Sequence, residues 1–362
     1  MTEILSVASV CIKSARRLEL PTGHRCSELH GHHFQITAHA RIPLGWASFA
    51  GDECPEMRRR LQSCLTPLDY LLLNERIPNP TDENLARWVL QNLDVPGVDR
   101  VSVQSTPMQG VDLSSSGDIH IWRKYVFQAA HQLPNVPIGH KCGRLHGHSF
   151  EVLLHVRQDV GVRNDQVGYD QLDDCWMPLA EQLNFRYLNE MEGLENPTSE
   201  HLAAWIWLRL MPMVSGLSSV SVFETSSCGA NFDGTSYRIW KEFTLDSAVR
   251  LDSAPAGSPL RQVHGHTYAL RLHLSAPLDQ VMGWTVDFGD VKAIFDPVYK
   301  ALDHNPLFEL EGMVVCDAAS IADWIYRRAQ ANLPQVVQVD LYETHGCGAS
   351  IASDNTCFFL RV

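Results

Sequence analysis

The tripeptide His-Gly-His occurs three times in this chain of 362 residues and is its clearest candidate for metal chemistry. The copies begin at His30, His146 and His264, so they are 116 and 118 residues apart. An alternating run of β-branched and aromatic residues follows each copy and predicts a strand. Side chains two positions apart in a strand point to the same face, so His146 and His148 can act together.

The second copy has a third histidine close by in the sequence. His131 lies near the end of the preceding predicted strand. Three neutral imidazoles with an open fourth position are typical of a catalytic zinc site, which predicts metal binding by His131, His146 and His148. An isolated His-X-His more often supplies hydrogen bonds at a strand end, but Cys142 and the repetition in register favour a metal.

Other landmarks recur at the same spacing and indicate a triplicated unit of about 120 residues. Two strands flank each His-Gly-His, two helices follow, and two more strands end the unit. The second helix begins at a Pro-Thr signal, where Thr81 or Thr198 is the expected N-cap. The sequence predicts an α+β fold with three domains, at residues 1–118 (repeat 1), 119–237 (repeat 2) and 238–362 (repeat 3).

Charge and composition exclude several classes of function. The formal net charge is −13, from 42 acidic and 29 basic residues, which argues against a surface that coats nucleic acid or anionic membranes. No apolar run is long enough to span a bilayer, and the first residues do not read as a signal peptide. The ten cysteines lack the spacing of a disulfide scaffold, so we expect reduced thiols in a cytoplasmic protein.

Residues 127–150, which hold Cys142 and the three histidines, resemble the 6-pyruvoyl-tetrahydropterin synthase family. The Cys-x-x-x-His-Gly-His spacing is similar to the branch that makes 6-carboxytetrahydropterin for queuosine and deazapurines; the 6-pyruvoyl branch has a longer gap. The resemblance covers the whole chain as three tandem copies. It implies the tunnelling fold, a four-stranded antiparallel sheet with two helices between the second and third strands.

The resemblance further implies an Asp-His pair supplied by a neighbouring subunit, and no single repeat keeps the full set. Repeat 1 has Arg16 in place of the first zinc histidine, and a guanidinium stays protonated and cannot ligate zinc. Repeat 2 keeps the histidines and Cys142 but has no Asp-His pair. Repeat 3 has Val249 for the first histidine yet keeps Asp303 and His304. We expect a covalent pseudo-trimer with one complete site, between repeats 2 and 3.

Each implied residue has a physical role in this hypothesis. Zinc would act as a Lewis acid on substrate oxygens. Cys142 would be the general base, with its pKa lowered by the nearby cation. His304 would transfer the second proton while Asp303 orients its ring. A carboxylate would anchor the pterin edge, and Glu224 and Glu343 remain equal candidates for it.

The leading hypothesis is a zinc-dependent 6-carboxytetrahydropterin synthase that converts 7,8-dihydroneopterin triphosphate and releases acetaldehyde and triphosphate. A second hypothesis keeps the site but eliminates triphosphate to form 6-pyruvoyl-tetrahydropterin. A third is a pterin-binding or scaffold protein without activity. Because family members stack two trimers, the resemblance also implies a homodimer of this chain.

Overall fold

The computed structural model describes residues 2–21, 23–158, 168–343 and 346–353. The chain divides into two compact units. Unit 1 comprises residues 1–119, 243–272 and 294–362, and unit 2 comprises residues 120–242 and 273–293. Repeat 1 and most of repeat 3 therefore belong to unit 1, whereas repeat 2 and a short part of repeat 3 belong to unit 2.

The three repeats share one order of elements: two long strands, two helices and two shorter strands. Repeat 1 contains β1 (Thr2–Arg16), β2 (His30–Ala40), α1 (Glu53–Leu65), α2 (Asp82–Asn92), β3 (Val98–Thr106) and β4 (Gln109–Ser114). Repeat 2 contains β5 (Ile119–His131), β6 (His146–Gln158), α3 (Tyr169–Leu183), β7 (Arg186–Tyr187), α4 (Ser199–Leu210), β8 (Leu217–Thr225) and β9 (Cys228–Phe232). Repeat 3 contains β10 (Tyr237–Val249), β11 (His264–Ser275), α5 (Phe288–Leu302), α6 (Ala318–Asn332), β12 (Val336–Glu343) and β13 (Cys347–Ser353).

The sheet within each unit is antiparallel along its long strands, as the sequence predicts. In unit 1, β1 pairs with β2 along its whole length, from Ser6 opposite Ala40 to Arg16 opposite His30. The other edge of β1 pairs with β13, so repeats 1 and 3 share a continuous sheet. In unit 2, the strand order is β9-β8-β6-β5, with two residues of β7 added in parallel.

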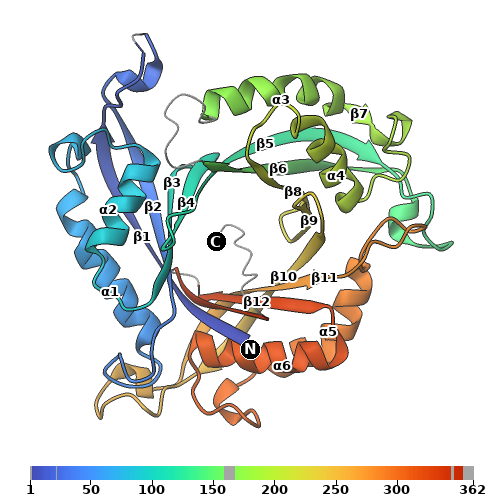
Figure 1. The fold of residues 1–362 in the computed structure, drawn as a ribbon. Helices are drawn as coiled ribbons and strands as arrows, with labels where there is room; N and C mark the ends of the chain where they lie inside the picture. Colours follow the sequence, from blue (N-terminus) through green and yellow to red (C-terminus); the bar gives the residue numbers. More distant parts are fainter. Residues whose placement is uncertain (1, 22, 159–167, 344–345, 354–362) are drawn as a thin grey trace. The chain divides into compact units, whose positions relative to one another are not determined.

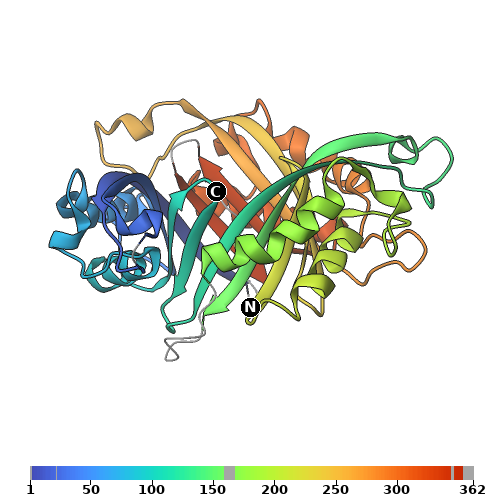
Figure 2. The same ribbon diagram turned by 90° about the horizontal axis from the view of Figure 1, so that it is seen from above.

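Helices cover one face of these strands in each repeat. In the view of Figure 1, α1 and α2 lie beside β1 to β4, and α5 and α6 lie beside β12. Figure 2 shows the same layering for the green segment, where α3 and α4 lie against one face of the strands of repeat 2. Apolar side chains from both layers form the core, for example Trp176 and Leu202 of the helices and Phe150 of β6.

The predicted cap residues begin the second helices. The Thr81 hydroxyl accepts a hydrogen bond from the Asn84 N–H, and the Thr198 hydroxyl accepts one from the His201 N–H. These caps satisfy amides that have no partner within the helix, which is why each helix begins directly after its Pro-Thr pair. Within the described residues, no helix has the length and apolar character needed to cross a membrane.

Candidate active site

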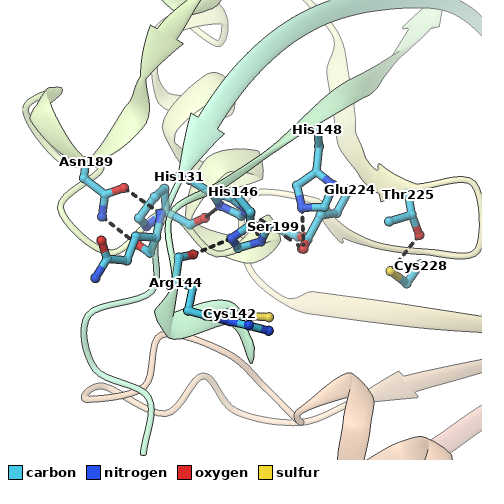
Figure 3. Close-up of polar contacts among 12 residues, drawn as sticks. His131, Cys142, Arg144, His146, His148, Asn189, Ser199, Glu224, Thr225 and Cys228 are labelled. Atoms are coloured by element: carbon cyan, nitrogen blue, oxygen red, sulfur yellow. Dashed lines mark hydrogen bonds and ion pairs between the residues drawn. The ribbon is translucent and has the colours of Figure 1, made fainter. Parts of the chain in front are cut away.

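Three predicted metal ligands converge in unit 2. His131 ends β5, and His146 and His148 lie two positions apart at the start of β6. The Nε2 atoms of His131 and His146 are 3.1 Å apart, and the His148 ring centre lies 5.0 Å from that of His146. Figure 3 shows the three rings gathered beside Glu224. One ligand atom from each of these four residues lies within 4.8 Å of the other three.

Hydrogen bonds to the backbone set the tautomers of two of the rings. His131 Nδ1 lies 2.9 Å from the Pro197 carbonyl oxygen, and His146 Nδ1 lies 2.7 Å from the Arg144 carbonyl oxygen. A carbonyl only accepts, so both protons sit on Nδ1 and both Nε2 atoms present lone pairs. Two lone pairs that face each other at 3.1 Å can both bind one cation, so this donor set fits zinc.

Glu224, at the end of β8, lies against the histidines. Its Oε1 is 3.3 Å from Nε2 of His148 and 4.0 Å from Nε2 of His131, and its Oε2 accepts a hydrogen bond of 2.8 Å from the Ser199 hydroxyl. Burial by itself would raise the pKa of Glu224, but hydrogen bonds from His148 and Ser199 and the electrostatic effect of the neighbouring imidazoles lower that pKa to about 2. Glu224 is therefore an ionised carboxylate beside the candidate metal site.

Cys142 lies in a short 3-10 turn, Lys141–Gly143, that precedes β6. Burial raises the pKa of its thiol, the carboxylates of Glu224 and Asp287 raise it further, and Lys141 acts in the opposite direction. The lowered pKa expected from the sequence depends on a bound cation. The protein's own groups produce the opposite shift because this part of the pocket is desolvated and the two carboxylates outweigh the single lysine.

A pocket of about 650 Å³ contains Cys142, His146, His148 and Glu224 together. One wall comes from repeat 3, through residues 279–289, which we call the wall segment. Repeat 3 contributes the lining residues Lys241, Trp284, Val286, Asp287, Phe288, Gly289 and Lys292. The pocket combines a metal-ligand cluster, a thiol, an ionised carboxylate, aromatic surface and lysines, which suits a flat polar heterocycle carrying an anionic group.

The wall segment is held to repeat 2 by hydrogen bonds that the sequence alone does not predict. Side-chain amides of Asn135 and Asn196 donate to the carbonyls of Val281 and Met282, each at 2.7 Å. The Thr198 hydroxyl donates to the Gly283 carbonyl at 2.5 Å. These contacts extend the role of the Asn-Pro-Thr signal from capping a helix to docking the wall segment.

Glu200 forms a further link to the wall segment. Its carboxylate accepts hydrogen bonds from the backbone N–H of Thr285 at 2.8 Å and from the Thr285 hydroxyl at 3.2 Å. Burial raises the pKa of Glu200 to about 7, although these hydrogen bonds act to lower it. Repeat 3 therefore completes the pocket of repeat 2 through residues of unit 2 alone.

Repeat 1 has the same framework without the metal ligands. Arg16 stands where repeat 2 has His131, and it donates to the Pro80 carbonyl at 3.1 Å, as His131 does to Pro197. The Arg16 guanidinium also pairs with the Asp82 carboxylate at 2.6 Å, with both side chains almost fully buried. A protein cation thus occupies the place that a metal would have in repeat 2.

The acidic and hydroxyl residues have exchanged places between repeats 1 and 2. In repeat 2 the helix residue Ser199 donates to the strand residue Glu224 at 2.8 Å. In repeat 1 the strand residue Ser105 donates to the helix residue Asp82 at 2.7 Å. The exchange moves the carboxylate to a position where it reaches the Arg16 guanidinium, so repeat 1 is organised around an ion pair.

Repeat 3 keeps part of the cluster. Val249 is buried at the position of His131, and Nδ1 of His266 lies 3.8 Å from Glu343 Oε2. Burial raises the pKa of Glu343 to about 7, with a further contribution from Asp317. Glu343 belongs to unit 1, and Glu224 is the one of the two glutamates that lines the pocket in unit 2.

The predicted Asp-His pair lies in unit 1. His304 Nδ1 is 2.9 Å from Asp303 Oδ2, and Asp303 Oδ1 accepts the Asp246 N–H at 3.0 Å. The hydrogen bond and charge of Asp303 raise the pKa of His304, as expected for a carboxylate that stabilises an imidazolium. The His304 side chain is 76% exposed, and its backbone has a positive φ of 57°.

The same backbone arrangement recurs in the other repeats. Tyr70 and Phe185 occupy the position of His304 with φ values of 53° and 57°. Asp69 accepts a hydrogen bond from the Lys13 N–H, and Asn184 accepts one from the Gln128 N–H. Asp303 accepts the Asp246 N–H in the same way. Among these three positions, only His304 can transfer a proton near neutral pH.

Comparison with known proteins agrees with this geometry. The sequence model of the 6-pyruvoyl tetrahydropterin synthase family matches residues 8–115, 120–235 and 238–354. The chain belongs to this family. A 6-carboxy-5,6,7,8-tetrahydropterin synthase from Synechocystis sp. is 40% identical over 119 residues, which are 31% of this chain and 91% of that protein.

Two further proteins are similar to parts of this chain. A dihydroneopterin monophosphate aldolase from Pyrococcus furiosus is 29% identical over 93 residues, which are 25% of this chain and 78% of that protein. The solved structure of 6-pyruvoyl tetrahydropterin synthase from Caenorhabditis elegans is 17% identical with a TM-score of 0.30, and the match covers 32% of this chain and 95% of that one. The present chain is an enzyme of this family that carries three family domains in tandem.

Proposed function

We propose that this chain is a zinc-dependent 6-carboxy-5,6,7,8-tetrahydropterin synthase that converts 7,8-dihydroneopterin triphosphate with release of acetaldehyde and triphosphate. The observation that carries the proposal is the pocket of repeat 2, which brings His146 and His148 of the histidine cluster together with Cys142 and Glu224. The 40% identity to the Synechocystis synthase supports this branch of the family. The short gap between Cys142 and His146 argues against 6-pyruvoyl formation.

His131, His146 and His148 would hold the zinc ion, since two of their Nε2 lone pairs are fixed toward one point by backbone carbonyls. When bound, the ion supplies Lewis acidity that makes neighbouring C–H and O–H groups of the substrate side chain more acidic. The charge of the bound ion would also favour the thiolate form of Cys142, against the effect of burial.

Glu224 anchors the pterin in this proposal. An ionised carboxylate accepts hydrogen bonds from a ring N–H and an exocyclic amine at once. The low pKa of Glu224 keeps it ionised, and the Ser199 hydroxyl fixes one of its oxygens. Glu343 has the opposite pKa shift and lies in the other unit, so we assign the anchor to Glu224.

Two groups share the proton transfers. Cys142 removes a proton from the substrate side chain, and His304, oriented by Asp303, delivers or removes the second. The histidine cluster and the Asp-His pair belong to different units. We propose that three repeats form a pseudo-trimer and that two chains form a homodimer, so the pair can come from the same chain or from the second copy.

Mixing two inactive variants distinguishes these sources. Cys142→Ala and His304→Ala are co-expressed with different affinity tags and the doubly tagged dimer is isolated. If the pair is supplied by the second chain, the mixed dimer regains activity at one of its two sites. If the pair acts within its own chain, the mixed dimer stays as inactive as either parent.

The test of the function itself is a product analysis. The zinc-loaded chain is incubated with 7,8-dihydroneopterin triphosphate, and the products are identified by mass spectrometry. The proposal predicts 6-carboxytetrahydropterin together with acetaldehyde. A 6-pyruvoyl product would assign the chain to the elimination reaction, and zinc binding without turnover would support a pterin-binding or scaffold role.

A further inference from the structure

The turn that carries Cys142 is capped by an imidazole. His140 Nδ1 accepts a hydrogen bond of 3.2 Å from the Cys142 backbone N–H. The other ring nitrogen, Nε2, lies 3.4 Å from Oδ2 of Asp287. Both side chains are largely shielded, with 22% of His140 and 16% of Asp287 exposed. The ring therefore joins the Cys142 turn to the wall segment of repeat 3.

These contacts determine which nitrogen carries the proton. Because Nδ1 accepts the Cys142 N–H, the proton lies on Nε2 and points toward the Asp287 carboxylate. Asp287 is itself fixed, since its Oδ1 accepts the backbone N–H groups of Gly289 at 2.7 Å and Asp290 at 3.1 Å. One carboxylate oxygen caps α5, and the other orients His140.

The other repeats show that the cap alone does not need this arrangement. In repeat 1, His24 Nδ1 accepts the Cys26 N–H at 3.1 Å. In repeat 3, the Ser258 hydroxyl accepts the Leu260 N–H at 3.3 Å and the same 3-10 turn forms. A hydroxyl is therefore sufficient to cap the turn, so capping does not explain the contact between His140 Nε2 and Asp287.

We propose that His140 and Asp287 are positioning residues for Cys142. Their pairing fixes the Cys142 turn against the wall segment, so that the thiol is held at one place in the pocket that repeats 2 and 3 build together. The inference rests on the proposed function in that Cys142 is the base. It also excludes His140 as a metal ligand, because one ring nitrogen accepts a backbone N–H and the other is protonated toward Asp287.

Three variants separate the cap from the pairing with Asp287. His140→Ala removes both. His140→Ser keeps a hydroxyl cap, as in repeat 3, but cannot reach Asp287. Asp287→Asn keeps the oxygen that caps α5 but turns an NH₂ group toward the protonated Nε2. His24→Ala in repeat 1 is the matched control, because it removes the same kind of cap beside Cys26.

The proposal predicts a fall in kcat of about 10- to 100-fold for His140→Ala, His140→Ser and Asp287→Asn, because a general base displaced by about 1 Å loses that much rate. KM and the zinc content stay within about twofold of the wild type, and His24→Ala keeps full activity. A His140→Ser variant with wild-type kcat would overturn the proposal, since the cap alone would then be sufficient. A loss of zinc in Asp287→Asn as large as its loss of kcat would show that the pair has only a structural role.

A second readout does not depend on turnover. Iodoacetamide alkylation of Cys142 is followed by peptide mass spectrometry, with Cys26 of the same molecule as the internal reference. We expect the rate at Cys142 relative to Cys26 to change severalfold in His140→Ser and Asp287→Asn. An unchanged ratio contradicts the positioning role even if the chain has another substrate, and a changed ratio supports it even if the pterin assay fails.

Discussion

Replacing Asp82 by alanine should destabilise repeat 1 strongly without affecting metal binding in repeat 2. Asp82 pairs with Arg16 at 2.6 Å, and the two side chains are only 2% and 3% exposed. The substitution leaves a buried guanidinium without its carboxylate and the Ser105 hydroxyl without its acceptor. Removing one partner of a buried pair costs about 3–5 kcal/mol.

The neighbouring residues supply matched controls. Asp94→Ala removes a carboxylate that is 87% exposed and pairs with Arg60, and such surface pairs contribute less than about 1 kcal/mol. Arg16→Met combined with Asp82→Ala removes both buried charges. Because no unpaired charge remains, the double variant should recover most of the loss.

Hydrogen exchange followed by mass spectrometry measures the effect where it occurs. The opening free energy of β1 and α2 should fall by about 3–5 kcal/mol in Asp82→Ala and by less than 1 kcal/mol in Asp94→Ala. The zinc content should remain one ion per chain in both variants. A loss below 1 kcal/mol in Asp82→Ala, or a double variant less stable than the single one, would refute the ion-pair account.

Three further predictions concern unit 2. His131→Ala should abolish zinc binding, measured by elemental analysis, while His264→Ala leaves it intact because repeat 3 has no third histidine. Glu200 has a folded-state pKa of about 7, above its unfolded value, so its stability contribution is complete at low pH and is lost as pH rises through 7. Glu200→Gln should therefore be more stable than wild type at pH 8 by up to about 3 kcal/mol, and no more stable at pH 4, in urea unfolding. Gly283→Ala should raise KM with little change in zinc content, since the added Cβ would lie 2.5 Å from the Asn196 amide nitrogen.

The sequence is sufficient to predict the order of elements and the convergence of the three candidate metal ligands. A strand period of two places His146 and His148 on one face, and the structure confirms this with ring centres 5.0 Å apart. The caps at Thr81 and Thr198 are also confirmed, because an N-cap depends on residues within one turn. Both predictions rest on patterns within a short stretch of sequence, the strand period and the N-cap signal.

Contacts between distant segments were not accessible in the same way. The wall segment reaches repeat 2 through backbone carbonyls of Val281, Met282 and Gly283, and a carbonyl gives no signal in a sequence. The Arg16–Asp82 pair is partly visible in the sequence. Arg16 stands at a histidine position, and comparison of Asp82 with Ser199 across the repeats shows an acidic residue where repeat 2 has a hydroxyl.

The pKa of Cys142 cannot be predicted from the sequence for a different reason. Burial and the carboxylates of Glu224 and Asp287 raise the pKa of the Cys142 thiol, whereas the lowered pKa expected from the sequence depends on a bound cation. The Asp287 contribution comes from the wall segment, which lies 145 positions later in the chain. Electrostatics at this site thus depend on packing that only the fold reveals.

If only one of the three similar sites is catalytic, a matched pair of cysteine variants should reveal it. Cys142→Ala and Cys26→Ala are compared for turnover of 7,8-dihydroneopterin triphosphate at equal zinc content. The account predicts that Cys142→Ala lowers kcat by at least about 100-fold, the typical contribution of a general base, and that Cys26→Ala keeps wild-type kcat. Equal losses in the two variants would contradict a single active site.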